Sequence, residues 1–241
     1  MTILYEDNHI IAVNKTSNEI VQGDKTGDTP LSEMVKAYIK KKYNKPGEVF
    51  LGVPHRIDRP TSGVVLFART SKALTRLCTL FSSHEKIKKT YLAIVEGKPE
   101  PAEARLEDYL LKNEVQNKSY VTTYSGGGHK TAKGKLATLS YKTLVVGDHY
   151  SLLEVNLETG RHHQIRCQLA HAGYPIKGDL KYGAKRSNPD GGICLHAWKI
   201  GFEHPVSHER VFITAPTPDD RMWNAFMQQV TDTDNILRQE D

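Results

Sequence analysis

Short runs of alternating or β-branched apolar residues recur along the chain and predict strands. Residues 3–6 and 9–14, on either side of Asp7-Asn8, have the pattern of a strand pair around a turn. The two runs that flank Gly147-Asp148 predict a hairpin. The strands of this hairpin are expected at residues 136–145 and 151–157. Three further strands are expected at residues 64–68, 90–96 and 194–202.

Apolar residues at helical spacing lie between these strands. The spacing from Leu31 to Ile39 predicts a helix over residues 30–43, with Thr29 as its N-cap and Pro30 in the first helical position. Three further helices are expected: one capped by Ser71 with Leu74, Leu77 and Phe81 on its apolar side, one over 163–172 that Gly173 ends, and one over 219–230.

Strands outnumber helices, and several consecutive strands have the pattern of antiparallel pairs. This order favours the α+β class, with a largely antiparallel mixed β-sheet flanked by helices. The sequence contains no internal repeat and no Pro/Ser-rich linker, so we expect one continuous domain over residues 1–230. Residues 231–241 are acidic and poor in apolar side chains, so we expect them to fray.

The composition excludes several classes of protein. The chain has 241 residues, of which 38% are hydrophobic and 25% charged, as in folded domains. No run approaches the roughly 18 apolar residues of a membrane helix, and the N-terminus lacks a signal-peptide pattern. Three cysteines without a C-x-x-C pair suit a reducing compartment. We therefore expect a cytoplasmic protein that does not span a membrane.

The net charge of +5 permits a nucleic-acid partner without identifying one. The basic residues are grouped rather than evenly spread. Each group is either a solvated surface or a contact for a polyanion, and the groups lie at residues 36–45, 86–89, 130–135 and 177–186.

A polar loop precedes the predicted strand at 64–68. It reads His55-Arg-Ile-Asp-Arg-Pro-Thr-Ser-Gly63 and contains a single acid, Asp58. Taken alone, such a loop is a common surface turn in which Asp and Ser bind their own backbone. However, six of these identities would coincide at a given position about once in 10⁷–10⁸ by chance, which favours a functional loop.

This loop resembles the signature loop of RluA-type pseudouridine synthases. The resemblance implies the pseudouridine synthase fold and the isomerisation of specific uridines in structured RNA, tRNA or rRNA, to pseudouridine. It also implies an essential aspartate and base flipping. Three further motifs occur in the family's order and, with residues 3–15, span nearly the whole chain: Lys89-Thr-Tyr-Leu-Ala-Ile-Val-Glu-Gly97, the stretch 159–183 that contains His-Gln-Ile-Arg166, and the stretch 195–205.

The reaction breaks the N-glycosidic bond of a uridine and rejoins the ring to the sugar through carbon, so it requires neither a redox cofactor nor a metal. It needs a carboxylate at the sugar–base junction that acts as nucleophile or as base, and Asp58 fits both roles. Burial beneath a nucleobase would raise the pKa of this carboxyl group, so a cation is needed beside it. The resemblance implies that Arg166 is this cation, because an arginine stays charged and binds both carboxylate oxygens.

The resemblance also implies that Tyr91 stacks on the target ring, although composition alone favours a core tyrosine. Extruding a base costs a few kcal/mol, and stacking returns about 1–3 kcal/mol. Arg56 is expected either to fill the gap left by the flipped nucleotide or to bind phosphate. Further RNA contacts are expected from His55, Arg59, Lys89 and Arg161.

Two other features invite different interpretations. The histidines at 55, 162, 163 and 171 lack the spacing of a metal site, so no metal is expected. Gly126–Gly128 lack a P-loop pattern and predict a flexible hairpin loop near Lys130 and Lys133. Two alternatives stay open: an RNA-binding protein that keeps the fold without catalysis, and a metal-dependent nuclease or hydrolase.

The sequence departs from the family in two motifs. The first reads Lys15-Thr-Ser-Asn where the family has Lys-Pro-x-Gly, and His162 stands where a small hydroxyl residue is common. We expect a stand-alone catalytic domain that lacks the S4-type RNA-binding domain of many relatives. We therefore expect a monomer without an obligate protein partner that selects its substrate through this domain, with the Asp-Arg-Pro form of the loop leaning towards tRNA.

Overall fold

The computed structural model describes residues 1–24, 26–83, 86–122 and 134–237. The absence of a repeat and of a linker predicts one continuous domain over residues 1–230; within the fold, the chain divides into two compact units. Because the chain passes between them several times, no linker in the sequence marks the division. Unit 1 comprises Met1–Thr90, Pro189–Gly192 and His196–Pro216, and unit 2 comprises Tyr91–Asn188, Ile193–Leu195 and Thr217–Asp241.

Unit 1 is built on a mixed sheet with the strand order β1-β2-β3-β9, and β10 pairs with β9. The β1–β2, β2–β3 and β9–β10 pairs are antiparallel, whereas β3 and β9 are parallel. The predicted N-terminal strand pair is thus confirmed. The elements are β1 (Thr2–Glu6), β2 (Ile10–Lys15), α1 (Leu31–Lys42), β3 (Ser62–Ala68), α2 (Ser71–Ser83), β9 (Leu195–Glu203) and β10 (Arg210–Thr214).

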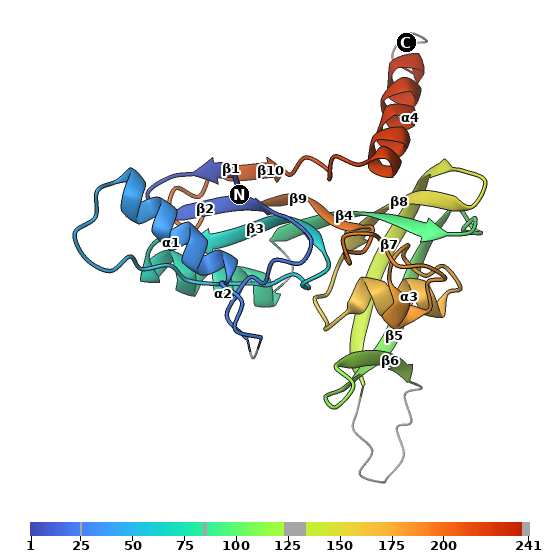
Figure 1. The fold of residues 1–241 in the computed structure, drawn as a ribbon, viewed down its shortest axis with the longest axis horizontal. Coiled ribbons are helices and arrows are strands. Elements are labelled where there is room, and N and C mark those ends of the chain that lie inside the picture. The colour runs from blue at the N-terminus through green and yellow to red at the C-terminus, as the bar shows by residue number, and fades with distance from the viewer. Residues whose placement is uncertain (25, 84–85, 123–133, 238–241) are drawn as a thin grey trace. The chain divides into compact units, whose positions relative to one another are not determined.

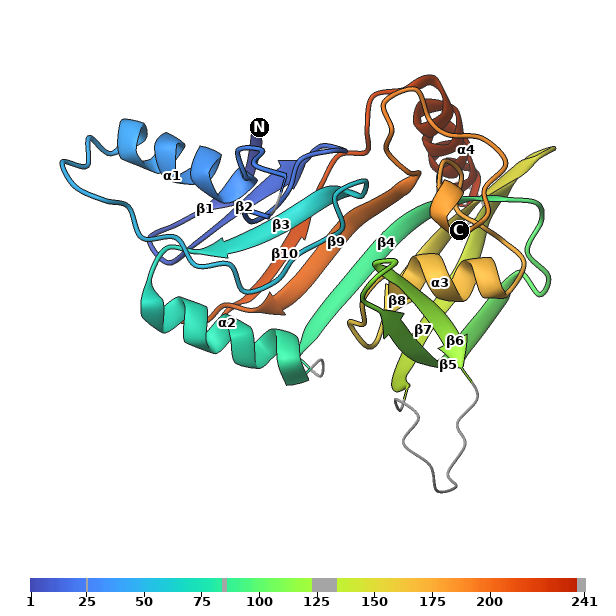
Figure 2. The same cartoon turned by 60° about the horizontal axis from the view of Figure 1, so that its bottom comes forward.

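Helix α1 covers one face of this sheet, as Figures 1 and 2 show. Since alternate strand residues point to opposite faces, every second residue of β2 and β3 meets the helix. The residues opposite one another in the register, such as Ile11 and Phe67, therefore reach the same core. That core consists of Ile11, Val13, Val21, Leu31, Val35, Ile39, Val65 and Phe67.

Both predicted helix caps of unit 1 are wrong by one residue. Pro30, not Thr29, occupies the N-cap position of α1 and offers no side-chain hydrogen bond. The amides of the first turn are satisfied instead by the backbone carbonyls of Ile20 and Val21, 2.8 and 3.2 Å away. For α2, the Oγ1 of Thr70 rather than Ser71 accepts a bond from the first turn.

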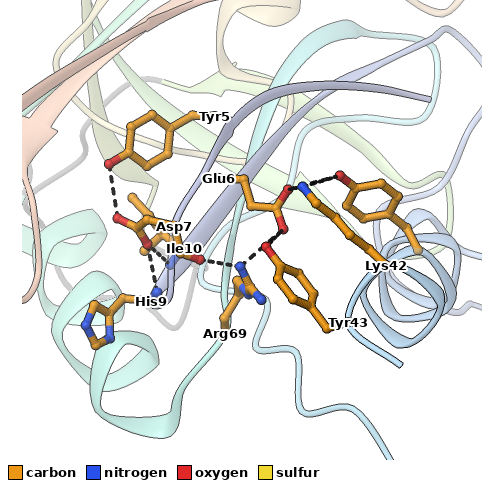
Figure 3. Close-up of polar contacts among 9 residues, drawn as sticks. Tyr5, Glu6, Asp7, His9, Ile10, Lys42, Tyr43 and Arg69 are labelled. Atoms are coloured by element: carbon orange, nitrogen blue, oxygen red, sulfur yellow. Dashed lines mark hydrogen bonds and ion pairs between the residues drawn. The ribbon is translucent and has the colours of Figure 1, made fainter. Parts of the chain in front are cut away.

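A polar cluster ties β1 to the end of α1 (Figure 3). The Glu6 carboxylate accepts hydrogen bonds from Lys42 Nζ (2.7 Å), Tyr43 Oη (2.8 Å), Tyr38 Oη (3.0 Å) and Arg69 Nη1 (3.2 Å). Burial alone would raise the pKa of Glu6, but the bonds from Lys42, Tyr43 and Tyr38 outweigh it and lower the pKa. One ionised acid therefore connects a strand, a helix and the segment that follows β3.

Unit 2 contains strands in the order β4-β8-β7-β5-β6, and the β7–β8, β5–β7 and β5–β6 pairs are antiparallel. The predicted hairpin around Gly147-Asp148 is confirmed as the β7–β8 pair. The elements are β4 (Ile87–Glu96, in unit 2 from Tyr91), β5 (Glu103–Asn113), β6 (Lys118–Thr122), β7 (Lys135–Val146), β8 (Tyr150–Leu157), α3 (Gln164–His171), a 3-10 turn η1 (Leu180–Tyr182) and α4 (Arg221–Leu237).

Helix α3 packs against β5, β6 and η1, and Figure 2 shows it beside these strands. Cys167 and Ala170 of the helix meet Leu110 and Ala137 of the sheet and Tyr182 of η1. The predicted role of Gly173 at the end of this helix is confirmed, because Gly173 adopts φ = 94° directly after the C-cap residue Ala172.

The C-terminal helix is longer than the sequence predicts. Residues 231–237, expected to fray, continue α4 to Leu237. The hydroxyls of Thr231 and Thr233 bond back to the carbonyls of Met227 and Gln229, which accommodates these polar residues in the helix. In the described part of the chain, no helix combines the length and apolar character needed to cross a membrane.

Candidate active site

Asp58 lies in the loop of unit 1 that leads into β3, and it is partly buried. Its carbonyl accepts a hydrogen bond of 3.0 Å from the amide of Thr61, which closes a turn. We call residues 58–62 the Asp58 loop. Its shape is set by contacts from other segments of the unit.

Lys15, at the end of β2, supports the Asp58 loop from within the protein. The residue is 1% exposed, and its Nζ donates to the carbonyls of Thr16 (2.9 Å), Arg59 (2.9 Å) and Thr61 (2.6 Å). Burial lowers the pKa of Lys15 to about 8, against the attraction of nearby acids that include Asp58. An ammonium group has three donors, so the charged form of Lys15 satisfies all three carbonyls.

Gly63 allows the far end of the loop to lie against β9. It adopts φ = 115°, and a Cβ here would lie 2.3 Å from the carbonyl oxygen of Ala197. Only a residue without a side chain fits both the backbone angle and this approach. The parallel pairing of Ser62 with His196 and of Gly63 with Ala197 therefore depends on this glycine.

The side chain of His55 contacts other residues of unit 1. Its ring stacks on Phe81 with 4.2 Å between centroids, and its Nε2 accepts a hydrogen bond of 2.9 Å from the amide of Leu66. Burial, with a smaller effect of Lys89, lowers the pKa of His55 to about 3, so the ring is neutral near pH 7. The predicted RNA contact of His55 stays a prediction.

The two arginines that flank Asp58 differ in their partners. Arg56 is exposed, and its side chain makes no hydrogen bond or ion pair with the described residues. Arg59 is also exposed, but its Nη2 lies 2.5 Å from the Oδ2 of Asp28. Arg56 is therefore the more available of the two for a phosphate.

Two predicted site residues lie on β4. Lys89 is buried, and burial lowers its pKa to about 8. Tyr91 is partly buried. The contact of Lys89 with RNA and the stacking role of Tyr91 stay predictions.

Arg166 is buried in α3 and holds a carboxylate that the sequence analysis did not single out. Its Nε lies 2.6 Å from Asp179 Oδ2 and its Nη2 lies 2.8 Å from Asp179 Oδ1, while its guanidinium lies 5.1 Å from the centroid of Tyr182. This two-point pairing fixes the orientation of the guanidinium. The pairing of Arg166 with Asp58 stays a prediction.

Asp179 could have been suspected from the sequence, because it lies within the third family motif and is the only acid between Arg166 and Asp190. Lys15 could also have been suspected, since it is the last residue of an apolar strand. What the sequence did not show is that both side chains are buried and that each contacts several groups.

The start of α3 contains the remaining candidates. Arg161 donates from Nε to the carbonyl of Leu136, 2.8 Å away, which limits its freedom to bind phosphate. His162 stacks on His163 with 3.8 Å between centroids, and His163 binds the hydroxyl of Tyr182. Among the described residues, no group of three His, Cys, Asp or Glu side chains could hold a metal ion. Gly126–Gly128, Lys130 and Lys133 lie outside the described residues.

Comparison with known proteins identifies the class. The model of the RNA pseudouridylate synthase family matches residues 9–171. The uncharacterized RNA pseudouridine synthase YlyB of Bacillus subtilis is 30% identical over 91% of this chain and 70% of its own length. Ribosomal large subunit pseudouridine synthase D of Zymomonas mobilis is also 30% identical, over 91% of this chain and 70% of its own.

The solved structure of human RNA pseudouridylate synthase domain containing 4 has the same fold, with a TM-score of 0.76 over 95% of this chain and 93% of that chain at 20% identity. The fold and the matched motifs thus define an RNA-modifying isomerase. The chain belongs to the RNA pseudouridine synthase family, in its RluA-type branch. Its reaction is the isomerisation of uridine in RNA.

Proposed function

We propose that Asp58 is the carboxylate that attacks or deprotonates the sugar–base junction of a specific uridine in structured RNA. The observation that carries this proposal is the loop itself. By the resemblance of this loop to the family's signature loop, its single acid matches the essential aspartate, and Lys15 and Gly63 hold the backbone that follows it. A catalytic group gains from such fixed geometry, because positioning lowers the barrier before chemistry begins.

The reaction balances without a cofactor. The bond between N1 and the sugar C1′ breaks, C5 of the same ring bonds to C1′, the hydrogen on C5 leaves as a proton, and N1 takes up a proton. The ring must rotate within the site, so the nucleotide is flipped out of its stack at a cost of a few kcal/mol. We assign Tyr91 to stack on the extruded ring, which returns about 1–3 kcal/mol.

The cations have separate tasks in this proposal. Arg166 balances the charge of Asp58, and its buried pairing with Asp179 supports a fixed orientation for that task. Arg56 fills the gap in the RNA or binds a phosphate, consistent with its exposed side chain. Arg59, Arg161 and Lys89 add phosphate contacts.

The substrate we propose first is ribosomal RNA. The names of several relatives, among them ribosomal large subunit pseudouridine synthase C of Vibrio parahaemolyticus, refer to the large ribosomal subunit. Since the form of the loop leans towards tRNA, tRNA is the second substrate to test. Both are structured RNAs in which the target base must be extruded.

The test replaces Asp58 with Asn, which keeps the shape of the side chain and removes its charge. RNA from cells that lack this enzyme, labelled with [5-³H]uridine, releases tritium when pseudouridine forms. We expect Asp58→Asn to abolish release while RNA affinity stays within a few fold. The matched control is Asp28→Asn, an exposed acid paired with Arg59, which should release tritium like the parent chain.

Full tritium release by Asp58→Asn would overturn the assignment of Asp58. Separate ribosomal RNA and tRNA fractions identify the substrate in the same assay. Release from the tRNA fraction alone would overturn the ribosomal assignment and leave the chemistry in place.

A further inference from the structure

His196 is the second residue of β9 and the first that belongs to unit 1. Its side chain is fully buried beside the end of the Asp58 loop. Its Nε2 lies 3.2 Å from the carbonyl oxygen of Ala215, and its Nδ1 lies 2.9 Å from the Oγ of Ser62. A carbonyl only accepts, so Nε2 carries the hydrogen. Burial lowers the pKa of His196 to about 4, so the ring is neutral and Nδ1 accepts the hydroxyl hydrogen of Ser62.

Ser62 connects this histidine to Asp58. It is the first residue of β3 and stands four residues after Asp58, across the turn that the amide of Thr61 closes. Its backbone pairs with that of His196, so the strand pairing and the side-chain bond anchor the same residue. The Nζ of Lys15 binds the backbone carbonyls of Arg59 and Thr61, which precede Ser62 in the loop. It makes no hydrogen bond with the side chain of Ser62.

The loop has little capacity to replace this bond. Thr61 is 2% exposed, and its Oγ1 already lacks a hydrogen-bond partner among the described residues. Without the acceptor on His196, a second buried hydroxyl beside it would be unsatisfied, which costs about 1–3 kcal/mol unless the backbone moves. The cheapest relief is a shift of the loop itself.

We propose that His196 is a positioning residue for pseudouridine formation: its Nδ1 accepts the Ser62 hydroxyl and thereby fixes the Asp58 loop. This inference rests on the proposed catalytic role of Asp58. His196 itself does not touch the substrate in this scheme. Its effect therefore falls on the rate of the chemical step and not on the affinity for RNA.

Two substitutions at position 196 separate the two bonds of the ring. The amide oxygen of Asn occupies the place of Nδ1 and can still accept from Ser62, whereas the amide of Gln reaches the place of Nε2 and can still donate to Ala215. We expect His196→Asn to retain the single-turnover rate of tritium release within about threefold. We expect His196→Gln to lose about 10- to 100-fold, the scale of a small misplacement of a catalytic group.

Ser62→Ala gives an independent measure, because it removes only a hydroxyl and is expected to fold. We expect it to slow release as much as His196→Gln does, and to add nothing in the double variant, because both changes remove one bond. RNA affinity by filter binding should stay within about twofold in each variant. Equal losses in His196→Asn and His196→Gln, losses that add in the double variant, or an unchanged rate in Ser62→Ala would overturn the inference.

The Asp58→Asn variant in the same assay separates this inference from the proposed function. If Asp58→Asn releases tritium normally, the catalytic assignment itself fails, and the positioning role fails with it. If Asp58→Asn is inactive while Ser62→Ala and His196→Gln keep the parent rate, only the role of His196 fails.

Discussion

Lys15 places a cation where water is excluded, and its three acceptors match the three donors of an ammonium group. Since burial lowers the pKa from 10.5 to about 8, the residue loses its proton in a range that can be assayed. A neutral amine has only two donors and no attraction for Asp58. We therefore expect the single-turnover rate of tritium release to fall about tenfold between pH 7 and pH 9.5.

A rise in pH has the opposite effect on the stability that Lys15 contributes. The unfolded chain keeps the proton on Lys15 up to about pH 10.5, so between pH 8 and 10.5 the unfolded state binds more protons than the folded state. The contribution of Lys15 to the free energy of unfolding therefore rises with pH, while activity falls. Urea unfolding and rate measurements on the parent chain and on Lys15→Met check both.

Lys15→Met is the control for this prediction. It should be slower than the parent chain at pH 7 and show no further decline up to pH 9.5. If both chains lose activity in parallel, the decline belongs to another group, such as the uracil ring, and the prediction for Lys15 is wrong.

At the scale of elements, Glu6 links β1 to α1 through groups that come from three segments (Figure 3). We expect Glu6→Gln to lower the free energy of unfolding at pH 7 by about 2 kcal/mol, because Lys42 and Arg69 lose a charged acceptor. The folded-state pKa is below the unfolded one, so this stabilisation is present at neutral pH and is lost as pH falls through the folded-state pKa. Urea unfolding at pH 7 and at acid pH measures both effects.

Glu33→Gln is the matched control for Glu6→Gln. Glu33 belongs to an exposed pair with Lys36 on α1, and such surface pairs contribute about 0.5 kcal/mol or less. The two variants should therefore differ clearly at pH 7. If Glu6→Gln costs no more than Glu33→Gln, the cluster does not stabilise the contact between strand and helix.

The elements that could be predicted from the sequence are those whose local pattern and tertiary contacts agree. Strand β3 is buried at every position and apolar from Val64 to Ala68, and α2 has a clear apolar stripe. Strand β5 was missed because exposed Glu103, Arg105 and Glu107 alternate with only partly buried neighbours. Such a stretch has little strand propensity of its own and is held by its long pairing with β7. Strands β6 and β10 were also missed.

The candidate site, like the fold, has features that the sequence predicts and features that only tertiary contacts explain. The motif order around Asp58 indicated the loop, but the partners that hold it come from residues 15 and 196, far away in the sequence. Likewise, Thr29 has the right chemistry for a cap, yet the amides of α1 bind the backbone of Ile20 and Val21. Local rules fail at these places because a tertiary contact supplies the missing partner.

At the scale of the whole molecule, 33 basic residues stand against 28 acidic ones, and exposed arginines differ in whether an acid is bound to them. Arg59 binds Asp28, and Arg105 binds both Glu107 and Glu158. Arg56 is exposed and makes no ion pair with the described residues. Affinity for RNA depends on salt through the phosphates that such available cations neutralise.

We therefore expect Arg56→Ala to weaken RNA binding and to reduce the slope of log affinity against log salt concentration by about 1, whereas Arg105→Ala should leave the slope unchanged. Filter binding between 50 and 200 mM salt, roughly the range over which such contacts are screened, measures the slope. Arg56→Gln separates charge from shape, because it keeps part of the side chain that would fill the gap of a flipped nucleotide. If Arg56→Gln restores the rate of tritium release without restoring the slope, Arg56 fills the gap; if it restores neither, Arg56 binds phosphate. Equal slopes for Arg56→Ala and the parent chain would show that Arg56 makes no phosphate contact.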